Sequence, residues 1–120
     1  MEYKWQTIPG TVPSKSNLYK IVNKGGHASL SKTDVLEAYE EKFGWHCDYR
    51  GLMISKPFEY QVRVYYPSKR ADLDNSLKVQ LDCLQHIKAI RNDNLCAKIV
   101  AEKFIDPESP RIEFRIITLD

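Results

Sequence analysis

Two aspartates and a lysine lie in one short stretch of this chain, at a spacing suited to metal chemistry. Asp72 and Asp74 are two residues apart where a predicted strand passes into a predicted helix, and Lys78 follows one helical turn later. A third acidic residue, Asp93, lies in a polar turn beyond that helix. Residues i and i+2 of an extended segment point to the same side, so Asp72 and Asp74 can face one point. If the helix brings its flanks together, the three aspartates converge, which favours a hard cation such as magnesium.

The electrostatics of such a cluster also favour a cation. Two carboxylates about 4 Å apart repel by roughly 4 kcal/mol at an effective dielectric constant near 20. Magnesium takes one or two protein carboxylates and keeps several waters, which leaves positions for a phosphodiester. It can polarise the phosphoryl oxygen and lower the pKa of an attacking water. A lysine at the rim would offset the charge that develops in the transition state.

The same residues have a purely structural interpretation. Asp74 can cap the following helix, Asp72 and Asp93 can be ordinary turn residues, and Lys78 with Asp82 can form a surface ion pair. Other metal sites fit less well. An EF-hand loop starting at Asp72 would have leucine in place of its glycine and cysteine in place of its closing glutamate. The three histidines lack zinc-ligand spacing with one another or with a cysteine.

Hydrophobic periodicity predicts the elements that would position these residues. Residues 58–66 alternate apolar and polar side chains, which is typical of a strand, and Pro67 ends it. Residues 74–88 carry leucines and an isoleucine at helical spacing. The other expected elements are a helix at about 32–43, capped by Ser31 or Thr33 and closed by Gly44, and strands at 3–8, 97–105 and 111–118.

The connections complete the predicted topology. Residues 10–30 are expected to form a long loop with room for a short hairpin around residues 23–26, and residues 106–110 a hairpin-type turn between the last two strands. The order β-α-β-α-β-β predicts an α+β fold, with one small mixed sheet and two main helices packed on it. The length predicts one domain over residues 1–120. The strand–helix–strand unit at 58–105 should cross over right-handed if its strands are parallel neighbours.

Composition narrows the functional class. Hydrophobic residues make up 42% and charged residues 28% of the chain, and no apolar run is long enough for a membrane span. The first residues do not resemble a signal peptide, and three cysteines without a CxxC pair suggest reduced thiols, so a cytoplasmic protein is expected. Residues 1–33 carry five basic residues and one acidic residue, which suits a polyanionic partner or an ordinary solvated surface.

Several of these motifs together resemble the RusA type of Holliday junction resolvase. The central motif is Asp72-Leu73-Asp74-Asn75-x-x-Lys78, followed by Leu81-Asp82-x-Leu84 and Asn92-Asp93-Asn94. The surrounding segments that match are the Ile8-Pro9-Gly10-x-x-Pro13-Ser14-Lys15-x-Asn17 loop with Tyr19, the strand at 58–66, and a closing hairpin at 103–113. The resemblance therefore covers most of the chain.

The resemblance implies a function and a set of site residues. Asp72, Asp74 and Asp93 would bind magnesium, with manganese able to substitute, and would be catalytic, while Lys78 would assist at the scissile phosphate. Members of the family are small homodimeric endonucleases that cut four-way DNA junctions by paired nicks. A two-fold dimer presents two equivalent sites to a two-fold substrate. The expected setting is recombination, repair or phage DNA processing in the cytoplasm of a bacterial or phage-infected cell, with a prophage as one source.

Four basic residues near the matched motifs are candidates for phosphate contacts: Lys15, Lys20, Lys69 and Arg70. Such contacts position DNA without reading its sequence. Two alternatives stay open at this point. One is a catalytically inactive DNA-binding protein with the same fold, and the other is an interaction domain whose aspartates are helix caps.

Overall fold

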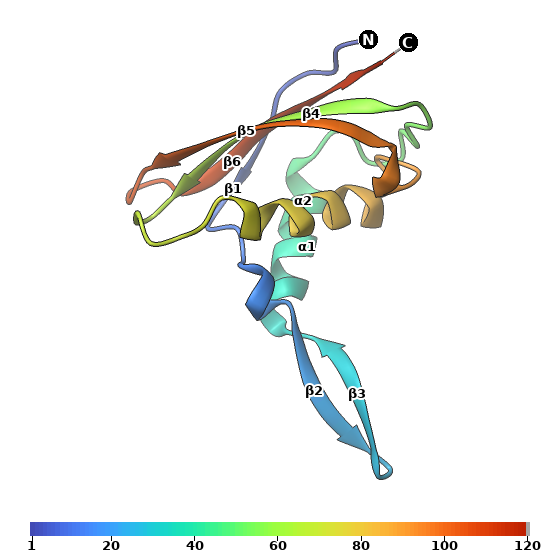
Figure 1. Cartoon of the computed structure of the whole chain (residues 1–120), viewed down its shortest axis with the longest axis vertical. Coiled ribbons are helices and arrows are strands. Elements are labelled where there is room, and N and C mark those ends of the chain that lie inside the picture. The colour runs from blue at the N-terminus through green and yellow to red at the C-terminus, as the bar shows by residue number, and fades with distance from the viewer. Residues whose placement is uncertain (120) are drawn as a thin grey trace.

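A four-stranded sheet covers two helices, and a separate two-stranded ribbon projects away from them (Figure 1). The structure is a computed structural model that describes residues 1–119, apart from the side chain of Lys15. The main sheet has the strand order β1-β6-β4-β5, and β2 pairs with β3 in the ribbon. The elements are β1 (Gln6–Pro9), the 3-10 helix η1 (Lys15–Asn17), β2 (Tyr19–Lys24), β3 (His27–Lys32), α1 (Asp34–His46), β4 (Phe58–Tyr66), α2 (Asp74–His86), the 3-10 helix η2 (Asp93–Leu95), β5 (Cys96–Ile105) and β6 (Arg111–Thr118).

The predicted strand at 58–66 is confirmed in full as β4, the central strand of the sheet. Its alternate residues, including Tyr60 and Val64, are buried beneath the sheet, where α1 and α2 pack. β4 pairs antiparallel with β6 and parallel with β5, so the predicted strand–helix–strand unit does join parallel neighbours. Phe43 of α1 stacks on Phe114 of β6 with ring centroids 5.5 Å apart, which ties the helix to the sheet. The α+β class and the element order are therefore confirmed.

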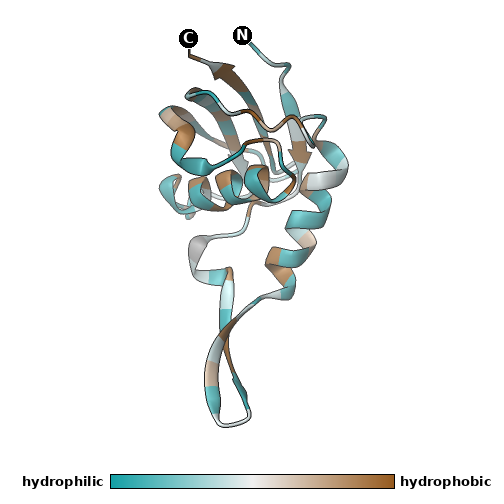
Figure 2. Cartoon of the chain, turned by 90° about the vertical axis from the view of Figure 1, so that its right-hand side faces the viewer, coloured by the Kyte–Doolittle hydropathy of each residue, from teal (hydrophilic) through white to brown (hydrophobic). Residues whose placement is uncertain are grey.

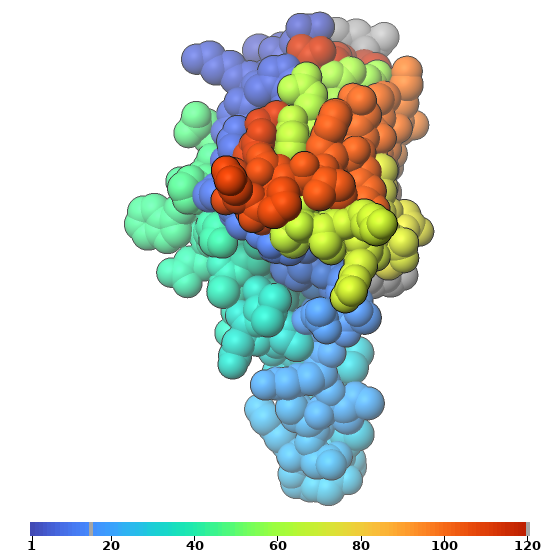
Figure 3. Space-filling model, turned by 90° about the vertical axis from the view of Figure 1, so that its left-hand side faces the viewer, coloured from blue at the N-terminus to red at the C-terminus, as the bar shows by residue number. Residues whose placement is uncertain are grey.

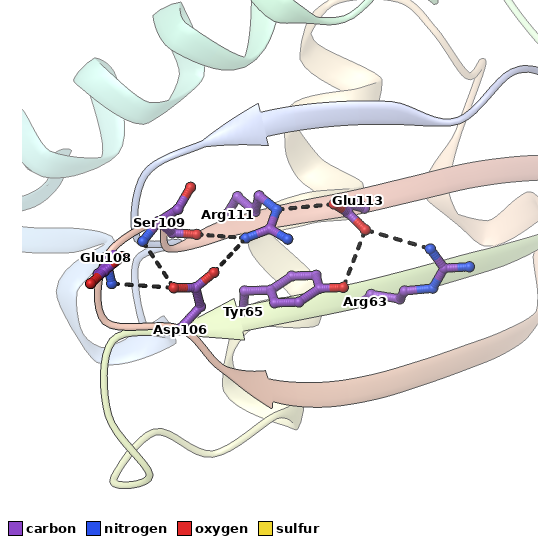
Figure 4. A network of polar contacts seen from close by, with 7 residues as sticks. All are labelled: Arg63, Tyr65, Asp106, Glu108, Ser109, Arg111 and Glu113. Atoms are coloured by element: carbon purple, nitrogen blue, oxygen red, sulfur yellow. Dashed lines mark hydrogen bonds and ion pairs between the residues drawn. The ribbon is translucent and has the colours of Figure 1, made fainter.

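The predicted closing hairpin is wrong, because β5 and β6 lie on opposite sides of β4. Neighbouring strands are about 4.8 Å apart, so the 106–110 turn has to span only about 10 Å across the end of β4. The backbone amide of Asp106 donates to the Tyr66 carbonyl at 2.8 Å, which starts this crossing. The Asp106 carboxylate then accepts from the backbone amide of Ser109 at 3.1 Å and from Arg111 at 2.9 Å (Figure 4).

Arg111 fixes this crossing to the exposed face of the sheet. Its guanidinium lies 3.8 Å from the ring centroid of Tyr65 on β4 and donates to Glu113 on β6 at 2.9 Å (Figure 4). The hydrogen bond from Arg111 lowers the pKa of Asp106 below its ordinary value, so the pair stays ionised at neutral pH. A network of side chains thus replaces the hairpin that the spacing suggested.

The expected loop at 10–30 is mostly replaced by the ribbon. The predicted turn around residues 23–26 is present, but its strands extend to Tyr19 and Lys32, through all six cross-strand pairs from Tyr19↔Lys32 to Lys24↔His27. The lysines and serines of this segment suggested a loop because they hide the alternation. Its few apolar residues, among them Ile21 and Leu30, stand between these polar ones.

Both helices agree with the prediction in position but differ at their ends. Thr33 caps α1, as one of the two predicted caps, and its Oγ1 accepts from the Leu36 amide at 3.2 Å. Gly44 does not end α1; the helix runs on to His46, and a side chain at position 44 would collide with the Arg50 guanidinium. Within residues 1–119, no helix has the length and apolar character needed to cross a membrane.

Candidate active site

A chain of buried polar groups fixes the start of α2 against β4. The Tyr60 hydroxyl donates to Gln80 Oε1 at 2.7 Å, and Gln80 Nε2 donates to Ser76 Oγ at 3.1 Å. The Tyr66 hydroxyl also reaches Ser76 Oγ, at 2.9 Å. All four residues are buried, so each needs these partners, and a fully paired network of this kind specifies one position for the helix. The turn between β4 and α2, which carries Asp72 and Asp74, is held in place as a result.

Lys103 clamps the same turn from the neighbouring strand β5. Its ammonium donates to the backbone carbonyls of Lys69, at 3.0 Å, and Ala71, and lies 5.7 Å from the centroid of the Tyr66 ring. The sequence analysis did not single out this residue. The sequence did contain a signal. Lys103 is in the same every-second-residue series as Ile99, Ala101 and Ile105, so it lies on the face of its strand that these apolar residues share.

Asp72 and Asp74 lie at the exposed start of α2, and neither forms an ion pair with another residue of the described chain 1–119. Asp72 accepts one long hydrogen bond, 3.4 Å from Asn75 Nδ2. Asp74 is the first residue of α2 and not its cap; Leu73 occupies the cap position, without a side-chain hydrogen bond. Burial raises the pKa of Tyr66, and Asp72 and Asp74 raise it further, so both carboxylates act on one hydroxyl. The prediction that Asp74 caps the helix is therefore wrong, and its carboxylate remains available.

Lys78 joins α2 to the segment that carries Asp93. Its ammonium lies 2.6 Å from Asp93 Oδ2 and 3.0 Å from Asp82 Oδ1, which confirms that Asp82 orients this lysine. Gln85, two turns along the same face of α2, accepts from the Asp93 backbone amide at 3.0 Å. The hydrogen bonds that Lys78 donates to Asp93 and then to Asp82 hold the pKa of this lysine well above its ordinary value. Lys78 is therefore a permanent positive charge and not a base.

The expected convergence of three aspartates is not present in this geometry. Among residues 1–119, no group of three acidic, histidine or cysteine side chains is close enough to hold a metal ion. Asp93 is drawn to Lys78 instead, which lies one turn, about 6 Å of helix rise, beyond Asp74. Like-charged carboxylates repel one another, whereas a lysine attracts Asp93. The sequence did not indicate the pairing of Asp93 with Lys78.

Two grooves flank α2, and both are bordered by the segment at residues 11–19. The first has a volume of about 450 Å³ and is lined by Asp72, Asn75 and Arg70, with apolar walls from Val12 and Tyr66. The second, of about 590 Å³, is lined by Lys78, Asp82 and Asp93 together with residues of α1 and of the base of the ribbon. Asp72 and Asp93 thus open onto concave surfaces that an extended ligand could follow along the helix.

The candidate phosphate-binding residues lie on exposed segments around these grooves. Lys69 and Arg70 precede Asp72 in the turn, and Lys20 is on β2 near the base of the ribbon. None of these three makes an ion pair with any residue whose side chain the structure describes. The fourth candidate, Lys15, has its side chain outside the described residues. Unpaired surface cations are the groups that bind phosphate most readily.

We expect Lys78→Met to lower the free energy of unfolding by no more than about 1 kcal/mol, because the ion pairs are partly exposed. The pKa of Lys78 is raised on folding above 10.5, so the contribution is complete below about pH 10.5 and is lost as the pH rises further. Urea unfolding of both proteins at pH 7 and above pH 10.5 measures this difference. A gap between the two proteins that grows with pH would contradict the assignment.

Lys103→Met should slow the chemistry of the site by about a hundredfold, because a shift of about 1 Å in a positioned group has an effect of this size. The substitution keeps the length of the side chain but releases the carbonyls of Lys69 and Ala71. Catalytic rate and thermal unfolding should be measured together. A variant that loses stability and keeps its rate would show that the clamp serves the fold alone.

Two exposed carboxylates, Asp72 and Asp74, thus lie at the start of a helix, one turn before the ion-paired Lys78 and next to the basic residues Lys69 and Arg70, which are unpaired within the described chain. A family model described as Endodeoxyribonuclease RusA matches residues 9–117, nearly the whole chain. A search of the curated proteins found no match. The matched range includes all four candidate catalytic residues and every strand of the structure from β2 to β5. The resemblance found in the sequence is thereby confirmed: this chain belongs to the RusA family of endodeoxyribonucleases, hydrolases that cut phosphodiester bonds in the DNA of Holliday junctions.

Proposed function

We propose that this chain is a magnesium-dependent endonuclease that resolves four-way DNA junctions by paired cleavage, with Asp72 and Asp74 at the centre of its active site. One observation carries the proposal above the others. Asp72 and Asp74 lie at the exposed start of α2, whose position a buried hydrogen-bond network fixes, and neither has an ion-pair partner among the described residues. A protein gains little stability from such an arrangement, so a ligand that is not a part of the chain is the natural counter-ion.

The donor set fits magnesium. The ion takes oxygen ligands, needs only one or two protein carboxylates and keeps several waters, and Asp72 with Asp74 supplies that number. Bound there, it would supply Lewis acidity at the phosphate and a water of lowered pKa. We propose Asp93 as a third ligand, which requires the three aspartates to come closer together than they lie here; among the described contacts Lys78 engages only its Oδ2. The absence of a histidine from this group is no obstacle, since a metal-bound water needs no histidine base.

The roles of the protein's own groups follow from their charges. Lys78 stays protonated, so it would stabilise negative charge on the scissile phosphate and would not remove a proton. Asp82 and Asp93 fix the position of its ammonium. Lys69 and Arg70, next to Asp72, would hold the phosphates beside the cut, and Lys15 and Lys20 those farther along the strand. Manganese is expected to substitute for magnesium, because it accepts the same oxygen ligands.

Paired cleavage requires two active sites, so the proposal includes a homodimer. A four-way junction has two-fold symmetry when its arms are stacked in pairs, and an isologous dimer would present one site to each of two strands of like polarity. One chain alone would leave the second strand uncut. The biological setting that follows is recombination, repair or phage DNA processing, in the cytoplasm of a bacterial or phage-infected cell.

A labelled four-way junction tests the proposal. Incubation with the protein and magnesium should give two symmetry-related nicks, EDTA should abolish them, and a linear duplex of the same sequence should remain intact. Manganese should restore cutting after EDTA is removed. Retarded migration of the junction with no cutting in either metal would contradict the proposal and would indicate a DNA-binding protein that lacks the chemistry.

A further inference from the structure

The β2–β3 ribbon stands clear of the rest of the molecule (Figure 3). Its two faces differ in chemistry. Residues directly opposite each other in an antiparallel pair lie on the same face. The cross-strand pairs therefore divide the ribbon into an apolar face and a basic face. The apolar face has the pairs Tyr19↔Lys32, Ile21↔Leu30 and Asn23↔Ala28; the basic face has Lys20↔Ser31, Val22↔Ser29 and Lys24↔His27.

The apolar face has no cover within the described residues. Ile21 and Leu30 are each 73% exposed and face each other across the ribbon, and Tyr19 is 49% exposed. Hydrophobic residues lie along the ribbon, away from the helices and the main sheet (Figure 2). An isolated two-stranded hairpin is marginally stable in water. Both facts indicate that a partner covers this face.

The distribution of charge indicates that the partner on the apolar face is not DNA. The only charge on the apolar face is Lys32, and Glu40 of α1 neutralises it, with both carboxylate oxygens at 3.0 Å. Lys20 and Lys24 lie on the opposite face, and neither pairs with an acidic residue of the described chain. The ribbon contains no acidic residue at all. A polyanion is therefore attracted to the basic face, and the apolar face is left for protein.

We propose that the apolar face of the ribbon packs against the same face of a second copy of this chain, and this inference rests on the homodimer of the proposed function. The Ile21↔Leu30 pair is the middle one of the three pairs on its face. A two-fold axis through this pair would bring Ile21 and Leu30 of one chain against Ile21 and Leu30 of the other. An isologous interface requires this self-complementarity. The Tyr19–Lys32 end of each ribbon would then cover the Asn23–Ala28 end of the other, so larger side chains meet smaller ones.

The area of the ribbon contact shows how much of a dimer interface it can supply. Strands of this length span about 20 Å by 10 Å, so each ribbon covers about 200 Å², a quarter of the roughly 800 Å² per partner of a standard interface. The ribbons would therefore supply part of a larger dimer interface, in which the Ile21↔Leu30 pair, buried by the contact, should have a large effect. With the apolar faces joined, Lys20 and Lys24 of each copy would point outward, on opposite sides of the paired ribbons, where they can attract phosphates.

Leu30→Asp tests the proposal without DNA or metal. Analytical ultracentrifugation of the full chain should show a dimer for the unsubstituted protein, and the substitution should raise its dissociation constant by at least about a hundredfold, because it buries an unpaired charge. Ser29→Asp is the matched control, since it adds the same charge to the adjacent residue on the opposite face. It should leave the dimer intact and weaken junction binding, because it adds an acid beside the lysines.

Cross-linking provides a second measurement if Leu30→Asp fails to fold. Ile21→Cys in a Cys96→Ser background should form a disulfide-linked dimer on oxidation, because a residue near a two-fold axis lies opposite its own copy. Cys47 and Cys83 are buried and should not react. Val22→Cys, on the opposite face, should not cross-link.

The outcomes separate this inference from the proposed function. A monomeric protein, or a dimer that resists Leu30→Asp and does not cross-link through position 21, would overturn the ribbon contact even if the protein cuts junctions. Loss of junction binding by Leu30→Asp with the dimer intact would also overturn it, and would assign the apolar face to DNA. A ribbon-linked dimer that fails to cut in magnesium would support this inference and refute the nuclease assignment.

Discussion

Asp74→Asn should abolish cleavage of a four-way junction and leave the junction bound as tightly as before, or more tightly. Loss of a carboxylate ligand should slow cleavage on the order of a thousandfold, about 4 kcal/mol of activation free energy, because a metal's Lewis acidity is worth several kcal/mol. Binding should not weaken, because the change removes a negative charge near the phosphates. Single-turnover cleavage in magnesium and binding in EDTA measure the two quantities separately.

A matched control for Asp74→Asn is Asp34→Asn. Asp34 is also the exposed first residue of a helix, in this case α1. The change therefore removes the same charge from the same helical position, but away from the site. It should cut at the unsubstituted rate. Each variant also loses up to about 1 kcal/mol of favourable interaction with a helix dipole, so similar melting temperatures would exclude a difference in folding. Asp74→Asn at the full cleavage rate would show that Asp74 is not a ligand.

Lys78→Met should slow cleavage by about a hundredfold to a thousandfold, the loss expected when one preorganised positive group is removed from a developing charge. Junction binding should weaken by less than about tenfold, since one phosphate contact among many is lost. Raising the pH should not restore or reduce the unsubstituted rate through Lys78, because its raised pKa keeps it protonated. The ratio of the cleavage effect to the binding effect is the measurement of interest.

Lys98→Met controls for the loss of any ion-paired surface lysine. Lys98 lies on β5, where its ammonium is 3.7 Å from Glu59, and its side chain is about as exposed as that of Lys78. This variant should cleave and bind normally. If Lys78→Met loses binding in the same proportion as cleavage, Lys78 is an electrostatic anchor for DNA and has no separate part in the chemistry.

The local elements were predictable because local chemistry determines them. The alternation at 58–66 predicted β4 in full, since only a strand buries every second residue on one face. The position of α2 followed from its apolar repeat, and Thr33 was one of two caps available to α1. The motif from Asp72 to Lys78 indicated the candidate site through spacing alone. All of these signals depend on residues that are close together in the sequence.

The errors concern contacts between residues far apart in the chain. The 106–110 turn was expected to close a hairpin, but β4 takes β6 on one edge and β5 on the other, and no local signal orders three strands. The buried face of α2 includes Ser76 and Gln80, which a hydrophobic pattern assigns to solvent. They are buried because Tyr60 and Tyr66 provide hydrogen bonds from another strand.

The sequence alone determined which residues this protein could use for chemistry: two carboxylates at the start of a helix, a lysine one turn on and a third acid beyond. Tertiary structure decided how they meet. In the folded chain Asp93 forms an ion pair with Lys78, and Asp72 and Asp74 have no counter-ion among the described residues. Lys103 binds the carbonyls of the turn that carries both aspartates. Tertiary structure also extended a basic loop into a ribbon with an uncovered apolar face. The reason is physical: residue types set which interactions are available, but electrostatic and packing energies depend on distances that only the folded chain defines.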